Sequence, residues 1–150
     1  MLYLDYERFR QNYLEAQRRY DEIVSEKEKL FARTQPQAVQ FDKELCTSGD
    51  KGSPFDGYLI EKERKRIDER LTEAKFILNE RKELLRLKEQ ELRNSNDIHD
   101  KIYRLRYIVH WKVQKISRET GYSESHLYRI LTSINDQIRK ISETLKDDKK

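Results

Sequence analysis

Hydrophobic residues recur every seven positions at the start of the chain. Tyrosines follow the first three of them by four positions, and charged residues fill most of the other positions. The resulting stripe consists of Leu2, Tyr6, Phe9, Tyr13, Ala16, Tyr20, Ile23 and Leu30. Because this spacing puts the side chains along one side of an α-helix, it predicts a long helix that packs, coiled-coil-like, against a partner helix.

The heptad pattern stops at Thr34, and the next regular pattern begins near Pro54. The residues between them, about 34–53, hold three of the chain's six Gly and Pro residues and have no sustained period. They predict an irregular loop that is either functional or disordered, with FDKEL (41–45) as a possible helical turn. Ser53 before Pro54 is typical of a helix start.

A second heptad stripe predicts a second helix over about residues 54–92. It consists of Ile67, Leu71, Ala74, Leu78, Leu85 and Leu92. Two stripes joined by one loop are buried most simply in an antiparallel helical hairpin. Such a hairpin buries little area alone, so we predict a homodimer or a higher homo-oligomer. The residues expected to pack in the hairpin or dimer are Phe9, Tyr13, Ile23, Leu71, Leu78 and Leu85.

Residues 94–96 (Asn-Ser-Asn) predict a break before the last third of the chain, because these side chains compete for backbone hydrogen bonds. One continuous helix through this segment is the alternative. With a break, residues 1–94 form a hairpin for oligomerisation or interaction, and residues 95–150 form a separate module.

Composition limits the fold and function further. The chain of 150 residues is 40% charged and 35% hydrophobic, with four Gly and two Pro, which favours an all-α fold over all-β or α/β folds. No long apolar run occurs and charge appears early, so we expect neither a membrane span nor export, and a cytoplasmic location. Cys46 and the three histidines show no metal-ligand spacing. No catalytic motif appears, so we expect no metal, no cofactor and no enzymatic activity.

The net charge of +4 lies entirely in the last third of the chain. Residues 95–150 carry 12 basic and 8 acidic residues, whereas residues 1–94 are neutral. Between residues 101 and 133, seven basic residues face only two acidic ones. A basic surface on a small module is typical of polyanion binding.

Residues 113–132 (VQKISRETGYSESHLYRILT) carry the pattern of a helix-turn-helix. Gly121 provides the tight turn, the apolar Ile116 lies five residues earlier, and Ser123 can cap a helix that begins at Glu124. The buried face of that helix is Leu127, Ile130, Leu131 and Ile134. A preceding helix buries Ile98, Ile102, Leu105 and Ile108. Three short helices are therefore expected to share one core, with Trp111 as a lid over it.

The run LRYIVHWKVQKISRETGYSESHLYRIL (105–131) resembles region 4 of sigma-70-type factors. The order of parts along the whole chain resembles the late-gene regulators of phages and prophages of the RinA, ArpU and LtrC type. The resemblance implies sequence-specific DNA binding that activates phage packaging and structural genes, with double-stranded DNA as the partner and host RNA polymerase as a further candidate partner. It also implies that the helix from Glu124 enters the major groove.

The candidate base contacts lie in the first turns of that helix, on the side opposite its apolar face. They are Glu124, Ser125, Tyr128, Arg129 and Thr132. Lys112, Lys115 and His126 are the candidate phosphate contacts. The alternative function is a non-enzymatic adaptor that binds RNA polymerase or another regulator through the same module and the hairpin. RNA binding is less favoured, because no aromatic stacking platform is present.

Overall fold

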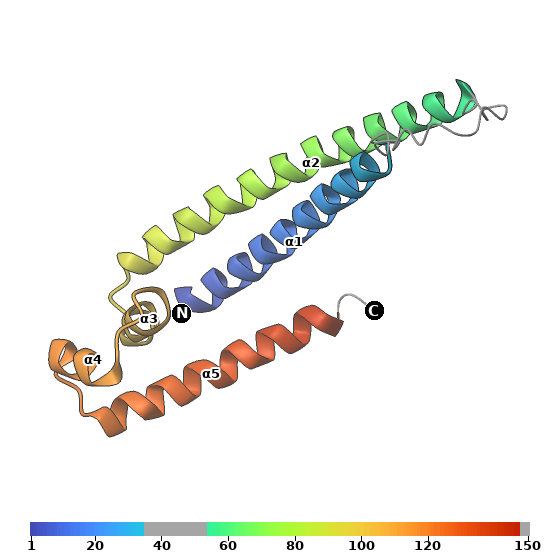
Figure 1. The fold of residues 1–150 in the computed structure, drawn as a ribbon. Helices are drawn as coiled ribbons and strands as arrows, with labels where there is room; N and C mark the ends of the chain where they lie inside the picture. Colours follow the sequence, from blue (N-terminus) through green and yellow to red (C-terminus); the bar gives the residue numbers. More distant parts are fainter. Residues whose placement is uncertain (35–53, 148–150) are drawn as a thin grey trace, which may run out of the picture. The chain divides into compact units, whose positions relative to one another are not determined.

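The computed structural model describes residues 1–34 and 54–147, and these residues are all-helical (Figure 1). The elements are α1 (Leu2–Thr34), α2 (Pro54–Arg93), α3 (Ile98–Tyr103), the π-helical η1 (Arg104–Ile108), α4 (Val113–Thr120) and α5 (Glu124–Asp147). The predicted all-α fold and both long helices are confirmed. No helix in the described ranges is both long and apolar enough to cross a membrane. The predictions for Ser53, Cys46 and residues 41–45 lie outside the described residues.

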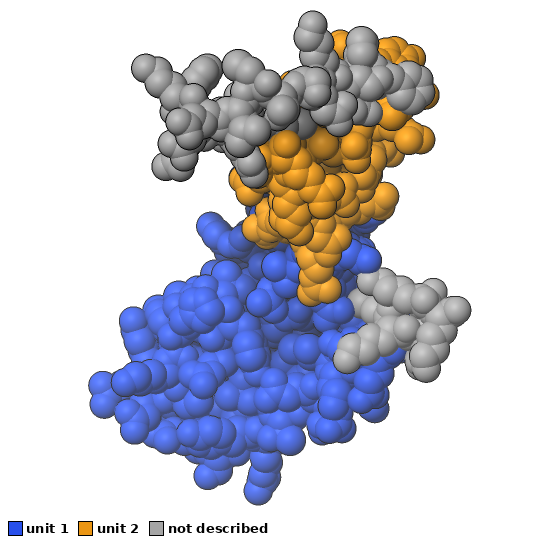
Figure 2. All heavy atoms as spheres, turned by 45° about the vertical axis from the view of Figure 1, so that its right-hand side comes forward, with its two compact units in different colours: residues 1–15, 80–150 blue, residues 16–79 orange. Residues whose placement is uncertain are grey.

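The chain divides into two compact units (Figure 2). Unit 1 comprises residues 1–15 and 80–150, and unit 2 comprises residues 16–79. This division differs from the predicted boundary at 94/95, because the first turns of α1 and the last turns of α2 pack in the same unit as α3, α4 and α5.

Unit 2 is an antiparallel pair of helical segments from α1 and α2. Two ion pairs of 2.7 Å join the segments, between Lys27 and Asp68 and between Glu26 and Arg70, and their order along the two helices runs in opposite directions. The core consists of Ile23, Leu30, Ile67 and Ala74, with Tyr20 and Leu71 packed against it. Both heptad stripes therefore meet as predicted.

The core of unit 1 is larger than the predicted three-helix core. Tyr3 and Tyr6 of α1 and Leu92 of α2 are buried in one cluster with side chains of α3, η1, α4 and α5. That cluster also contains Ile102, Tyr103, Leu105, Val113, Ile116, Leu127, Ile130, Leu131 and Ile134, with Leu85 and Trp111 packed against it. Three short helices alone do not make this core, since α1 and α2 supply part of its apolar surface.

The remaining predicted hairpin residues are partly covered. Phe9 is half-buried, and the Lys88 ammonium lies 5.8 Å from its ring centroid. Tyr13 and Leu78 are also half-buried. Of these three side chains, Phe9 has a cation–π neighbour on α2.

The break between α2 and α3 is confirmed, and one continuous helix is excluded. Residues 95–97 are not helical, and Asp97 caps α3 by accepting a 2.9 Å hydrogen bond from the backbone N–H of His99. Asp100, in the first turn of α3, is buried and accepts from the N–H of Tyr3 at 3.0 Å and from the Ser95 hydroxyl at 2.7 Å. The start of α1 is thereby tied to the start of α3.

Candidate nucleic-acid interface

The turn after α4 depends on Gly121. Its φ of +75° lies in the left-handed region, which residues with a Cβ adopt only at a cost in free energy. Its N–H donates a hydrogen bond to the Ser117 carbonyl at 2.8 Å. The helix ends here because glycine accepts this conformation and returns an N–H to the last turn. The predicted bend at Gly121 is confirmed.

Ser123 begins the next helix as predicted. Its hydroxyl accepts from the backbone N–H of His126 at 3.3 Å, and its carbonyl accepts the first helical hydrogen bond, from Leu127 at 3.0 Å. The Ser117 hydroxyl donates to the Tyr122 carbonyl at 2.6 Å and fixes the connection. Residues 121–123 thus join α4 and α5 in the manner of a helix-turn-helix.

One face of α5 anchors it in unit 1. Leu127, Ile130, Leu131 and Ile134 are all buried, in the same cluster as Ile116 of α4. Burial of a full aliphatic side chain stabilises the fold by about 1.5–3 kcal/mol, so this face holds the helix firmly. The apolar pattern predicted these four positions correctly.

The opposite flank of α5 is exposed. The five predicted base contacts, Glu124, Ser125, Tyr128, Arg129 and Thr132, are all exposed. Tyr128 keeps 56% of its surface exposed although it is aromatic. Ser125 and Arg129 also line a shallow depression of about 500 Å³ beside the turn. In a single chain, this flank is therefore accessible to a partner molecule.

The three predicted phosphate contacts, Lys112, Lys115 and His126, are exposed as well. The Lys115 ammonium lies 3.9 Å from the ring centroid of Trp111, a cation–π geometry, and Trp111 packs against the core of unit 1 as a lid. The ring of His126 lies 5.2 Å from that of Tyr122. Aromatic neighbours thus position two of the three side chains.

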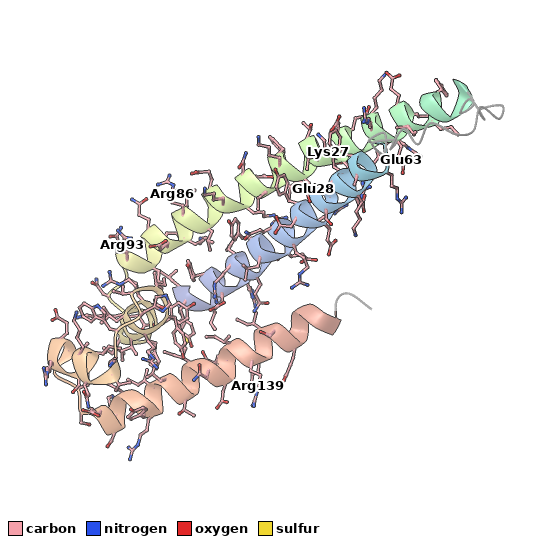
Figure 3. All side chains as sticks on the ribbon, viewed as in Figure 1. Lys27, Glu28, Glu63, Arg86, Arg93 and Arg139 are labelled. Carbon is pink, nitrogen blue, oxygen red and sulfur yellow. The ribbon has the colours of Figure 1, made fainter. Side chains whose placement is uncertain are left out.

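Ion pairing distinguishes the basic residues of this region from several of those on the long helices. Among the described residues, none of the seven basic side chains between 101 and 133 forms an ion pair. They are Lys101, Arg104, Arg106, Lys112, Lys115, Arg118 and Arg129. Arg86 and Arg93, labelled on α2 in Figure 3, by contrast pair with Glu83 and Glu89. Positive charge that carboxylates of the chain do not compensate therefore accumulates around the helix-turn-helix.

α5 is longer than the short recognition helix that was expected. It has 24 residues, and its second half contacts the first half of α1. The Tyr3 hydroxyl donates to Gln137, and the Gln11 amide donates to the Ser142 hydroxyl at 3.0 Å. The first turns of α5 thus extend from a helix that is anchored along its length.

Sequence reasoning missed the polar residues that build this support. Tyr3, Glu7 and Asp100 are buried, yet none lies in the heptad stripe or in a recognised motif. The available signal was the aromatic residue at position 3 beside the stripe, which widens the apolar face of α1.

Comparisons with protein-family models, with curated proteins and with solved structures found no match to this chain. Among the described residues, no group of three or more His, Cys, Asp or Glu is placed to hold a metal ion. The geometry and charge of the helix-turn-helix are therefore the features that indicate a function.

Proposed function

We propose that this chain is a sequence-specific DNA-binding transcription regulator that reads the major groove with the first turns of α5. One observation carries the proposal: Gly121 turns the chain into a helix whose apolar face is buried and whose polar flank is exposed at its N-terminal end. Helix-turn-helix proteins place the N-terminal residues of the second helix against base edges. The uncompensated basic residues around the motif support binding to a polyanion.

The side chains of the exposed flank fit distinct roles. Arg129 can bind guanine O6 and N7 through two N–H groups, and Glu124 can accept from the cytosine amino group. Ser125 can donate or accept, and Tyr128 can contact a thymine methyl group or a phosphate. The Thr132 hydroxyl donates to the Tyr128 carbonyl at 2.9 Å, which leaves its oxygen and methyl group for a base.

Backbone phosphates are the proposed targets of the remaining candidates. Lys112, Lys115 and His126 would fix the register of the protein on the duplex without reading sequence. By its resemblance to phage late-gene regulators, the protein is proposed to act in a bacterial cytoplasm as an activator of packaging and structural genes. Host RNA polymerase is the candidate further partner.

The test is selection of duplexes from a random-sequence pool by the full chain, followed by fluorescence anisotropy on an enriched duplex and a scrambled one. We expect the enriched duplex to bind at least about 10³-fold more tightly. Affinity should fall steeply between about 50 and 200 mM salt, because phosphate contacts release counterions.

Two outcomes would reject the proposal. One is a selection that enriches no sequence, and the other is equal affinity for the enriched and scrambled duplexes. Co-purification with RNA polymerase in the absence of DNA enrichment would instead support the adaptor function.

A further inference from the structure

Two cationic side chains meet at Trp111, in the connection between η1 and α4. The guanidinium of Arg106, in η1, donates a 3.1 Å hydrogen bond to the Trp111 carbonyl. The ammonium of Lys115, in α4, lies 3.9 Å from the centroid of the Trp111 ring. Lys112 directly follows Trp111, and all three basic side chains are exposed. Arg106, Trp111, Lys112 and Lys115 together are the Trp111 cluster.

The backbone before Trp111 fixes this meeting point. The N–H of Val109 donates to the Arg104 carbonyl at 3.0 Å, and the N–H of Trp111 donates to the Leu105 carbonyl at 2.9 Å. Between them, His110 has a φ of +59°, in the left-handed region that residues with a Cβ adopt only at a cost in free energy. A π-helical turn and a strained residue of this kind are frequent at functional sites. The connection thus holds Trp111 in one position, packed against the core of unit 1.

The groups that hold these cations are uncharged. A carbonyl oxygen and the face of an indole ring attract a cation but do not compensate its charge. Among the described residues, no carboxylate forms an ion pair with Arg106, Lys112 or Lys115. Positive charges gathered around one residue repel each other, so an anion that contacts several of them is bound favourably.

A nucleic-acid backbone is the anion that this cluster fits best. Arginine carries five N–H donors in a planar fork, and the Trp111 carbonyl uses one of those of Arg106, so the others can bind a phosphate. A duplex presents one phosphate charge per about 1.7 Å of its axis, so several exposed cations can each meet a phosphate. Lys112 and Lys115 also belong to the start of α4, the first helix of the motif, and in helix-turn-helix proteins that helix crosses the DNA backbone.

We infer that the Trp111 cluster is a clamp for DNA phosphates, in which Arg106 is a further phosphate contact beside Lys112 and Lys115. Trp111 is its positioning residue, because its carbonyl holds Arg106 and its ring holds Lys115. The inference rests on the DNA binding of the proposed function but not on the reading of sequence by α5, so the two can be tested apart.

Anisotropy titrations of Arg106→Gln between about 50 and 200 mM salt, on the enriched and the scrambled duplex, test the clamp. Loss of one phosphate contact should reduce the slope of log affinity against log salt by about 0.9. At about 0.1 M salt this change corresponds to an affinity loss of about five- to tenfold on both duplexes. Arg106→Lys keeps the charge and should recover most of the slope.

Arg86→Gln is the matched control (Figure 3). Arg86 belongs to unit 1 and its side chain is 63% exposed, but it lies on α2 and pairs with Glu83. This variant removes the same charge as Arg106→Gln and should leave the slope unchanged. Equal slopes of the two variants, or an unchanged slope in Arg106→Gln, would overturn the inference.

Trp111 gives a second readout that needs no variant, because it is the only tryptophan of the chain. A bound duplex should reduce the quenching of its fluorescence by acrylamide, since the cluster then faces phosphates and not solvent. Unchanged quenching in the DNA-bound chain would overturn the inference even if Arg106→Gln does not fold.

The clamp and the proposed function fail in different ways. A selection that enriches no sequence, together with a reduced slope of Arg106→Gln on any duplex, rejects sequence reading and supports the clamp. An enriched duplex whose binding is equally affected by Arg106→Gln and Arg86→Gln rejects the clamp and supports the proposed function. If Arg106→Gln weakens binding to polyglutamate but not to DNA, the cluster binds an acidic protein and the clamp is rejected.

Discussion

The Tyr103 hydroxyl donates a 2.5 Å hydrogen bond to the carboxylate of Glu7, 96 positions earlier in the chain. Both side chains are buried, and Glu7 keeps only 3% of its surface exposed. The second partner of Glu7 is Arg10, whose guanidinium lies 3.2 Å from the same carboxylate. A buried carboxylate is costly without partners, so Glu7 depends on this hydrogen bond. The contact links the first turns of α1 to α3 within unit 1.

Replacing Tyr103 with phenylalanine removes the donor and leaves the Glu7 carboxylate buried. We expect Tyr103→Phe to lower the free energy of unfolding by about 1–3 kcal/mol, since the carboxylate loses a hydrogen bond that it cannot replace with water. Urea denaturation at neutral pH measures this change. Tyr58→Phe is the control, because Tyr58 is 63% exposed and its change should stay within about 0.5 kcal/mol. Equal effects of the two variants would contradict the role of the contact.

The buried tyrosines also predict how stability depends on pH. Burial raises the pKa of Tyr103 well above its usual value near 10, and the hydrogen bond and negative charge of Glu7 raise it further. Burial is likewise the main cause of the raised pKa values of Tyr3, Tyr6 and Tyr107. The unfolded chain releases these phenol protons near pH 10 while the folded chain keeps them. Stability is therefore fully present below about pH 10 and falls as the pH rises above it.

Each tyrosine that keeps its proton only in the folded state lowers stability by about 1.4 kcal/mol per pH unit in that window. Urea denaturation between about pH 8 and 11 measures the slope. Tyr103→Phe should reduce the slope by the contribution of one tyrosine, about 1.4 kcal/mol per pH unit. An unchanged slope in that variant would show that Tyr103 ionises as readily in the folded chain as in the unfolded one.

Gly121 and Gly57 should respond to alanine with opposite signs. Apart from the neighbouring backbone, no atom of the described residues lies within 4 Å of a Cβ added at either position, so we expect the backbone conformation to decide the outcome. At Gly121 the φ of +75° makes alanine cost about 1–2 kcal/mol. Gly57 lies within α2, where alanine stabilises a helix by about 0.5–1 kcal/mol. Thermal unfolding followed by circular dichroism compares the two variants, and a stabilising Gly121→Ala would contradict the left-handed turn.

Local patterns predicted the elements well. The heptad stripes located α1 and α2 because every seventh side chain of a helix returns to the same side, and Gly121 and Ser123 marked the turn because each has a specific backbone role. The exposed flank from Glu124 followed from the apolar face of the same helix. These features depend only on residues that are close in sequence.

Long-range contacts were not predictable in this way. No period relates Tyr3 to Asp100 or Glu7 to Tyr103, since these pairs are 97 and 96 residues apart. The heptad reading therefore placed all of α1 in a hairpin module, whereas its first turns complete the core of unit 1. The full length of α5 was missed for the same reason, because its second half is supported by α1.

Arg129 provides the sharpest test of sequence reading by α5. Arg129→Ala removes the proposed bidentate contact with guanine, so it should cost about 1–3 kcal/mol on the enriched duplex and much less on a scrambled one. Lys112→Ala, at a proposed phosphate contact, should weaken binding to both duplexes alike. It should also reduce the slope of log affinity against log salt by about one phosphate contact. Anisotropy titrations at several salt concentrations distinguish the two effects.

Arg139 is the matched control on the same helix (Figure 3). Its side chain is exposed, but its guanidinium pairs with Asp136 at 3.6 Å and with Glu143 at 4.0 Å, and it lies well after the first turns of α5. Arg139→Ala removes the same charge as Arg129→Ala and should leave the preference for the enriched duplex unchanged. If the two variants lose affinity equally on both duplexes, Arg129 contributes only charge, and the base contact assigned to it is wrong.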